Sequence, residues 1–217
     1  MTSLPVSVVL VRHGATAWST ARRHTGRTDV PLSPDGEQQA AALLPMMARL
    51  TGRGPVSVLS SPLQRAWRTA ELAGLTPYAL DDDLAEWDYG DYEGLTTAQI
   101  REHVPGWTVF NAPCPGGETA DEVAARCDRV LGRIAADVAT ATPHRTTWDT
   151  APPVPTVVVA HSHLLRSLAA RWLGRPVADG GLLELGVAAT CVLGHEHGFP
   201  TLRHWNLSNP LVVDPFS

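Results

Sequence analysis

The sequence predicts an α/β fold with three layers, α/β/α, around a mostly parallel central sheet that has an antiparallel edge. The apolar runs at 8–11 and 157–160 are typical of strands buried on both faces. Helical patterns separate the strands, which indicates parallel crossovers, and two β-type runs meet at a turn after residue 182. We expect one domain over residues 1–217, because 217 residues with 44% hydrophobic content form a substantial core.

Helix-cap signatures predict where the helices in the first half of the chain begin. Ser33 followed by Pro34 predicts a helix start, and Ser61 followed by Pro62 repeats the pattern. Pro45 predicts a kink within the first of these helices. In chain order we expect a strand at 8–11, a long loop at 15–32, a helix at 33–50, a strand at 56–59, a helix at 61–73, a short strand at 78–80 and a short helix at 97–103.

The second half begins with a capping box. Thr119 with Glu122 three residues later predicts the start of a long amphipathic helix. The Thr- and Pro-rich segment that follows is long for a connection, so a mobile surface loop is expected at about 141–155. The remaining predicted elements are a strand at 157–160, a helix at 164–173, strands near 184–193 and 200–207, and a turn at 194–198 between those two strands.

Composition excludes several classes of protein. The net charge of −5 and pI near 6.0 argue against binding to nucleic acid or to an anionic membrane. The three cysteines are odd in number and lack a Cys-x-x-Cys motif, which argues against a disulfide framework or a zinc knuckle and favours the reducing cytoplasm. We expect no signal peptide, because the N-terminus has no basic region and its short apolar run ends in Arg12-His13-Gly14. We expect no transmembrane helix, because no apolar stretch approaches the required ~18–20 residues.

Two histidines follow the two buried strands directly. His13 comes after 8–11 and Arg12, and His161 comes after 157–160. Carboxyl ends of parallel strands lie on one side of the sheet, where ligands bind, so the two rings are expected to meet over one crevice. One histidine at a strand end is more often structural than catalytic, and the pair beside an arginine is the stronger signal.

An arginine and a run of carboxylates are the other candidates. Arg65 is predicted near a helix N-terminus, where N–H groups and the guanidinium favour a phosphate. Arg68 is expected to be a solvated surface residue. A proton donor is sought in the acidic run at 81–93, and the residues alone leave Glu86, Asp88 and Glu93 as equal alternatives.

The motifs resemble those of the histidine phosphatase superfamily, which includes cofactor-dependent phosphoglycerate mutases and many phosphatases. They extend from residue 8 to about 163 in the order found in that superfamily. Residues 86–95 together with 25–29 look most like a branch of small acid phosphatases and sugar-bisphosphate phosphatases. The matching segments are Arg12-His13-Gly14 with Thr16, Ser61-Pro62-Leu63-Gln64-Arg65-Ala66 with Thr69-Ala70, Glu86 with Gly90, Glu93 and Gly94, Pro115-Gly116-Gly117-Glu118-Thr119, and His161.

The resemblance implies a phosphoglycerate mutase-like fold and hydrolysis of a small phosphorylated metabolite, such as a sugar phosphate or bisphosphate. His13 becomes the phosphohistidine, Glu86 donates the proton, and Glu93 stabilises a loop. No cofactor and no metal are expected, since arginines and His161 supply the positive charge. The implied substrate-binding residues are Arg12, Arg65, His161, Ser19, Thr25, Gly26 and Ser162.

Two positions depart from the pattern of the superfamily. Ser162 stands where Gly is usual after the second histidine, and serine is able to cap the following helix. Ser19 stands where the mutases usually carry Asn, which weakens one expected phosphate contact.

Two alternatives remain open. The first is a phosphoglycerate mutase, which the missing long basic insert between Glu86 and His161 disfavours. The second is a non-catalytic or metal-binding regulatory protein with His161-x-His163 or His195-x-His197 as ligands. The oligomeric state is also open, with a homodimer through the late β segment as one expectation.

Overall fold

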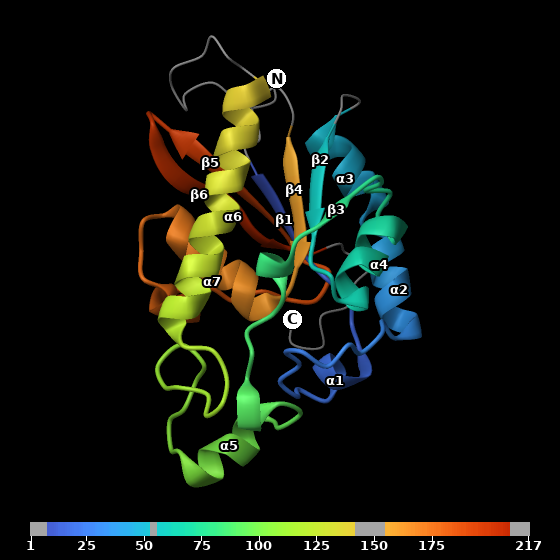
Figure 1. The fold of residues 1–217 in the computed structure, drawn as a ribbon. Helices are drawn as coiled ribbons and strands as arrows, with labels where there is room; N and C mark the ends of the chain where they lie inside the picture. The colour runs from blue at the N-terminus through green and yellow to red at the C-terminus, as the bar shows by residue number, and fades with distance from the viewer. Residues whose placement is uncertain (1–7, 53–55, 142–154, 209–217) are drawn as a thin grey trace.

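The computed structural model describes residues 8–52, 56–141 and 155–208 (Figure 1). The mobile loop predicted at about 141–155 falls outside the described residues except at its two ends. The strands are β1 (Val8–Arg12), β2 (Ser57–Ser60), β3 (Ala79–Leu80), β4 (Thr156–Ala160), β5 (Thr190–Glu196) and β6 (Phe199–Leu207). The helices are α1 (Ala17–Thr20), α2 (Pro34–Ala41), α3 (Leu44–Thr51), α4 (Gln64–Leu72), α5 (Thr97–His103), α6 (Ala120–Ala141) and α7 (Ser162–Trp172).

The six described strands form one sheet in the order β3-β2-β4-β1-β5-β6. The pairs β3·β2, β2·β4 and β4·β1 are parallel, whereas β1·β5 and β5·β6 are antiparallel. Helices α6 and α7 cover one face, and α2, α3 and α4 cover the other (Figure 1). The predicted fold class, a mostly parallel sheet with an antiparallel edge between two helical layers, is confirmed.

The core divides at the central strands. Val8 and Leu10 of β1 pack on the side of α6 and α7, while Val9 and Val11 pack on the side of α2 to α4. Residues 157–160 of β4 alternate in the same way, because successive side chains of a strand point to opposite faces. Both strands are therefore buried on both sides, which fixes the position of the residues that follow them.

Several predicted boundaries are wrong. The helix predicted at 33–50 is two helices, α2 and α3, and the loop predicted at 15–32 contains the short helix α1. The last two strands are Thr190–Glu196 and Phe199–Leu207, so β5 begins six residues later than predicted and 184–189 lie outside it. The capping box of Thr119 and Glu122 at the start of α6 is confirmed by the reciprocal hydrogen bonds between these two residues.

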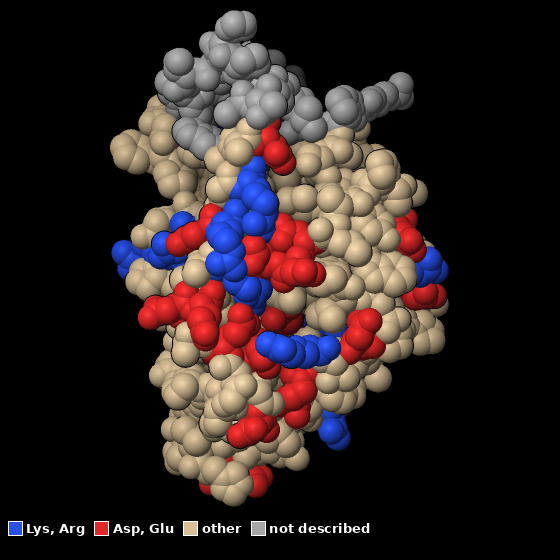
Figure 2. All heavy atoms as spheres, viewed as in Figure 1, with Lys and Arg blue, Asp and Glu red and all other residues tan. Residues whose placement is uncertain are grey.

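Charged residues on one face of α6 are paired with acids. Arg129 and Arg133 form ion pairs with Asp81 and Asp83, and Arg126 pairs with Glu118. Figure 2 shows arginines bordered by Asp and Glu on this face, so the face has no broad basic patch. None of the described helices is both long and apolar enough to cross a membrane.

Candidate active site

The carboxyl ends of β1 and β4 lie side by side. Arg12 is the register partner of Ala160, and the backbone N–H of His13 donates to the carbonyl of Ala160 at 3.0 Å. The two rings that follow, His13 and His161, have their centroids 5.1 Å apart at 60°. The parallel pairing of two buried strands thus brings together two histidines far apart in the chain.

Gly14 allows the chain after β1 to pack against the backbone of α2. A Cβ at Gly14 would lie 2.3 Å from the carbonyl oxygen of Gly36, a distance that excludes any side chain. The N–H of Gly14 donates to the Thr69 hydroxyl of α4 at 3.1 Å. These contacts place His13 at the bottom of a crevice between the loops.

The ring of His13 is fixed by one hydrogen bond. Its Nδ1 lies 2.7 Å from the carbonyl oxygen of Gly14, which only a protonated Nδ1 bonds, so the neutral ring carries its lone pair on Nε2. Burial lowers the pKa of His13 well below 6.5, and the charges of Arg65 and Arg12 lower it further. The ring is therefore neutral at and below neutral pH, and within the described residues no hydrogen bond occupies Nε2.

The ring of His161 is held at both nitrogens. Arg65 Nε donates to Nδ1 at 3.1 Å, so the proton of the neutral ring is on Nε2, which lies 2.7 Å from the Ser61 hydroxyl oxygen. Burial, followed by the charge of Arg65, lowers the pKa of His161 well below 6.5. Its tautomer is thus the opposite of that of His13.

Arg65 is fully buried and is bonded mainly to backbone carbonyls. Besides its bond to His161, it donates to the carbonyls of Thr25, Gly26 and Thr28 at 2.9 to 3.0 Å. The guanidinium therefore holds the 25–28 loop against the histidine pair. Ser61 is not the N-cap of α4, which is Leu63, and the helix has no side-chain cap. The Ser61 hydroxyl accepts from the Leu63 N–H at 3.3 Å and lies against His161.

Arg12 has one nitrogen without a partner. Its NH1 donates to the carbonyl of Leu185 at 2.5 Å, and its Nε is buried and unbonded in the described structure. Burial lowers the pKa of Arg12 to about 10, so the side chain is still a cation at neutral pH. A buried unpaired donor of a cation is costly unless an anion satisfies it.

Glu86 is anchored at the N-terminus of α7. Its carboxylate accepts hydrogen bonds from the backbone N–H groups of His163 and Leu164, at 3.1 and 2.9 Å, and from that of Trp87. It therefore provides the cap that the N-cap residue His161 does not. Ser162 does not act as the cap: it is the first residue of the helix, with an ordinary helical backbone.

Arg126 and Glu118 hold the segment that carries Glu86. Arg126 forms a two-pronged ion pair with Glu118 and donates to the carbonyls of Asp83 and Ala85. Glu118 in turn accepts from the N–H of Asp88 at 2.9 Å. The Pro-Gly-Gly-Glu motif thus acts on the site through the position of the Glu86 segment.

A cavity of about 240 Å³ opens above His13. Arg12, His13, Glu86, Ser19, Thr25 and Ser162 line it, as expected for site residues, whereas Gly26, Arg65 and His161 are not among its lining residues. The hydroxyl of Ser19 is engaged in a capping box with Thr16 of the same turn. The complete lining is Arg12, His13, Ser19, Arg22, Arg23, His24, Thr25, Glu86, Tyr89, Ser162 and His163.

Five lining residues were not predicted as site residues from the sequence: Arg22, Arg23, His24, Tyr89 and His163. His163 Nδ1 lies 2.5 Å from the Tyr89 hydroxyl, and the ring of His24 lies 4.8 Å from Tyr89 and 5.8 Å from His163. Burial lowers the pKa of His24 to about 4 and that of His163 well below 6.5. The one available signal was the position of His163, two residues after His161 at the start of the predicted helix.

The histidines of the two pairs considered as metal ligands contact other side chains instead of converging on one point. His163 is bonded to Tyr89, and His195 packs against the Trp172 ring at 4.9 Å, while His197 lies in the turn after β5. Among the described residues there is no group of three or more His, Cys, Asp or Glu that is able to hold a metal ion.

Comparison with known proteins assigns the family. The model of the histidine phosphatase superfamily (branch 1) matches residues 8–208. An acid phosphatase of Mycobacterium tuberculosis is 41% identical over 88% of this chain and 87% of its own. Sedoheptulose 1,7-bisphosphatase of Saccharomyces cerevisiae is 34% identical over 80% of this chain and 70% of its own.

Solved structures agree. A characterised open reading frame of Mycobacterium tuberculosis has a TM-score of 0.80 at 39% identity, over 93% of this chain and 97% of the other. A mycobacterial glucosyl-3-phosphoglycerate phosphatase in complex with VO3 has a TM-score of 0.76 at 32% identity, over 94% and 100%. The predictions of the family and of a phosphatase are confirmed: the chain belongs to the histidine phosphatase superfamily.

Proposed function

We propose that the protein hydrolyses phosphate monoesters of small metabolites, of the sugar phosphate or bisphosphate class, through a phosphohistidine at His13. The observation that carries the proposal is the state of this ring, which lines the cavity with Nδ1 held by the Gly14 carbonyl and with no hydrogen bond at Nε2 among the described residues. The names of the relatives, acid phosphatase and sugar-bisphosphate phosphatase, support the substrate class.

In the first step the lone pair of Nε2 attacks phosphorus as the ester P–O bond breaks. The uncatalysed reaction is among the slowest known, with enzymatic accelerations up to ~10²¹, so positioning and charge stabilisation supply most of the catalysis. The unpaired Nε of Arg12 is suited to bind one phosphoryl oxygen. The leaving oxygen takes a proton from Glu86, which lines the same cavity.

In the second step Glu86 takes a proton from water, and the water oxygen attacks phosphorus. The N–P bond breaks, and inorganic phosphate leaves the neutral His13 ring. The two steps need a protonated and then an ionised Glu86 beside a neutral His13. The lowered pKa of His13, caused first by burial, keeps the ring neutral in mildly acidic solution.

His161, whose ring lies next to that of His13, and Arg65, which donates to His161, also contribute to the proposed mechanism. We keep the prediction that His161 holds a phosphoryl oxygen, since its Nε2–H needs only to exchange the Ser61 hydroxyl for that oxygen. Arg65 has its Nε and both terminal nitrogens bonded already, so we propose that it fixes the tautomer of His161 and adds positive charge. Four of its five N–H donors are bonded within the described residues, so one N–H of NH1 is left for a direct bond to phosphate.

Phosphate release tests the proposal. The protein is incubated with p-nitrophenyl phosphate and with a panel of sugar phosphates and bisphosphates, and free phosphate is measured. A separate incubation with 3-phosphoglycerate and a catalytic amount of the bisphosphate tests the mutase alternative. Free phosphate supports the hydrolase, and isomerised product without phosphate release contradicts it.

The proposal includes catalysis without a metal, in the cytoplasm, by a protein that binds neither nucleic acid nor membranes. Arg12, Arg65 and the α7 N-terminus supply positive charge at the site. Dialysis against a chelator is expected to leave the rate of phosphate release unchanged, and a loss that Zn²⁺ or Mg²⁺ restores contradicts it. A homodimer through β6 stays a prediction, tested by sedimentation.

A further inference from the structure

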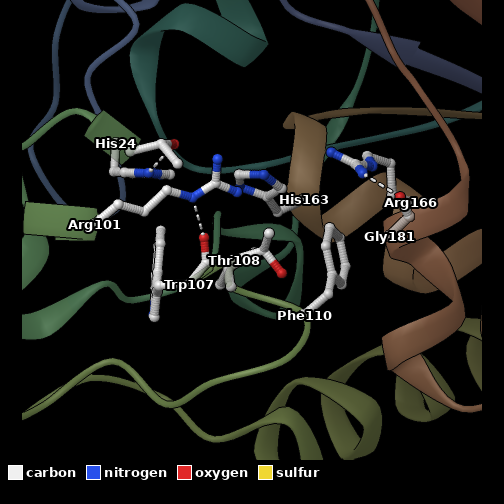
Figure 3. Close-up of a pocket in the computed structure, with 10 residues that line it drawn as sticks. His24, Arg101, Trp107, Thr108, Phe110, His163, Arg166 and Gly181 are labelled. Atoms are coloured by element: carbon white, nitrogen blue, oxygen red, sulfur yellow. Dashed lines mark hydrogen bonds between the residues drawn. The ribbon is translucent and has the colours of Figure 1, made fainter. Parts of the chain in front are cut away.

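A second cavity adjoins the one above His13. It has a volume of about 200 Å³ and shares His24 and His163 with the first cavity (Figure 3). Each cavity alone is below the ~300 Å³ at the small end of typical ligand sites, and the two together exceed it. The two shared residues place the second cavity beside the one in which a phosphoryl group would lie at His13.

Two arginines from different elements line this second cavity. Arg101 of α5 donates its Nε to the carbonyl of Trp107 at 2.8 Å. Arg166 of α7 donates its Nε and NH2 to the carbonyls of Gly180 and Gly181 at 2.9 and 3.3 Å. Each side chain is thereby fixed by backbone carbonyls, as the dashed lines in Figure 3 show.

Neither arginine has a carboxylate partner. In the described part of the chain, Arg27, Arg68, Arg126, Arg129, Arg133, Arg171 and Arg175 form ion pairs, whereas Arg101 and Arg166 form none. Their remaining terminal nitrogens, both of Arg101 and NH1 of Arg166, have no hydrogen-bond partner among the described residues. Two positive charges thus line one small cavity without a counter-charge from a salt bridge.

The surroundings of the two arginines differ. The Phe110 ring lies 4.6 Å from the guanidinium carbon of Arg166, whose pKa is lowered by burial and raised in part by the charges of Glu86 and Glu184. His24 and His163, which line both cavities, are neutral because burial lowers the pKa of both. Arg166 is half-buried, where a charge attracts an anion more strongly than in water, whereas Arg101 is exposed.

We propose that this cavity binds a second anionic group of the substrate, a phosphate or a carboxylate, through Arg101 and Arg166. The inference rests on the proposed phosphatase function and narrows its substrate class to monoesters whose alcohol carries another anion. Guanidinium donors suit both anions: the two terminal nitrogens of Arg101 match paired oxygens, and NH1 of Arg166 adds a further donor. Arg101 and Arg166 are then specificity residues and take no part in the chemical step.

Matched substrate pairs test the proposal. The first pair is fructose 1,6-bisphosphate and fructose 1-phosphate, with cleavage followed at carbon 1. The second pair is 3-phosphoglycerate and glycerol 1-phosphate, which differ in the carboxylate. The wild-type protein is expected to have a kcat/KM at least tenfold higher for the two-anion member of one pair, and that pair identifies the anion.

The variants Arg101→Gln and Arg166→Gln are expected to lower this ratio by about 10- to 100-fold each, the effect of one lost charged hydrogen bond. Arg49→Gln, at an exposed arginine of α3, is the matched control and should keep the wild-type ratio. Arg166→Lys restores the charge without the fork and should recover part of the ratio.

The outcomes separate this inference from the proposed function. Failure to release phosphate from p-nitrophenyl phosphate or any other monoester contradicts the phosphatase itself. Hydrolysis with no preference within either pair, or equal losses on both members of a pair in the variants, overturns the second-anion site alone. A lower ratio in Arg101→Gln supports the site even if Arg166→Gln loosens the 180–181 turn.

Discussion

A histidine follows each of the adjacent strands β1 and β4, but the two rings have opposite hydrogen-bond states. His13 is held at Nδ1 by the Gly14 carbonyl and has Nε2 open to the cavity. His161 accepts from Arg65 at Nδ1 and lies against Ser61 at Nε2. Both rings are neutral, since burial lowers the pKa of each. In the proposed mechanism the hydrogen-bond partners of each ring, rather than its place in the sheet, assign His13 as the nucleophile and His161 as a donor.

The largest expected effect comes from exchanging each ring for an amide. His13→Asn should lower kcat by about 10⁴-fold or more, as loss of a nucleophile does in other hydrolases. His161→Asn should lower it by only about 10²- to 10³-fold, the cost of one transition-state donor. The rate of p-nitrophenyl phosphate hydrolysis by each variant measures the loss of kcat, and urea unfolding of each variant checks that its fold is stable. Equal losses would remove the distinction between the two strand ends.

Glu86 extends the comparison, because its carboxylate caps the helix that follows β4. Glu86→Gln keeps a capping oxygen but is unable to donate a carboxyl proton. Its kcat should fall by about 10²- to 10⁴-fold with glycerol phosphate and much less with p-nitrophenyl phosphate, whose leaving group needs no proton. Glu37→Gln on α2 is the control at a half-exposed glutamate. The same loss with both esters would assign Glu86 a structural role only.

Ser61 tests the donor state of His161 on a smaller scale. Ser61→Ala removes the hydroxyl that lies 2.7 Å from Nε2, so kcat/KM should fall about two- to tenfold, the value of one neutral hydrogen bond. Ser167→Ala removes another buried hydroxyl, which bonds only the helix carbonyl of His163, and should leave the rate as it is. A larger loss in Ser167→Ala than in Ser61→Ala would contradict the assignment.

The neutral histidines also predict a pH dependence of stability. Burial lowers the pKa of His24 to about 4, so below pH 6.5 the unfolded state binds more protons than the folded state. The free energy of unfolding should therefore fall as the pH falls from 6.5 to about 4, by up to about 1.4 kcal/mol per pH unit for this residue. Urea unfolding between pH 7 and 4.5, followed by tryptophan fluorescence, measures the slope.

His24→Gln should make that slope shallower, and His103→Gln at an exposed position of α5 is the matched control. An unchanged slope in His24→Gln would show that His24 is free to take up a proton in the folded protein.

Local patterns predicted the parts of the site that depend on neighbours in the chain. Buried strands are visible as apolar runs, so the position of both histidines followed from 8–11 and 157–160. The α6 capping box involves residues three apart and was equally visible. The motif at Ser61 predicts a local helix cap, but its hydroxyl bonds the Leu63 N–H before the helix and also His161, 100 residues away, which only the folded sheet brings close.

The second cavity was likewise not predictable from local sequence patterns. Its walls come from α5, the 107–110 segment, α7 and the 180–181 turn, and no spacing in the sequence links these segments. Residues 184–189 were expected to be strand, but the carbonyl of Leu185 accepts from Arg12 instead of a neighbouring strand. The family resemblance identified the proposed catalytic residues without knowledge of these distant contacts. It gave no information on Arg101 or Arg166.

Trapping the covalent intermediate tests the central distinction most directly. The protein is mixed with a ³²P-labelled monoester, quenched in alkali within milliseconds and digested, and the labelled peptide is sequenced. The label should lie on the peptide that contains His13, disappear in His13→Asn and persist in His161→Asn. Label on the His161 peptide, or turnover by His13→Asn at the wild-type rate, would contradict the assignment of His13 as the nucleophile.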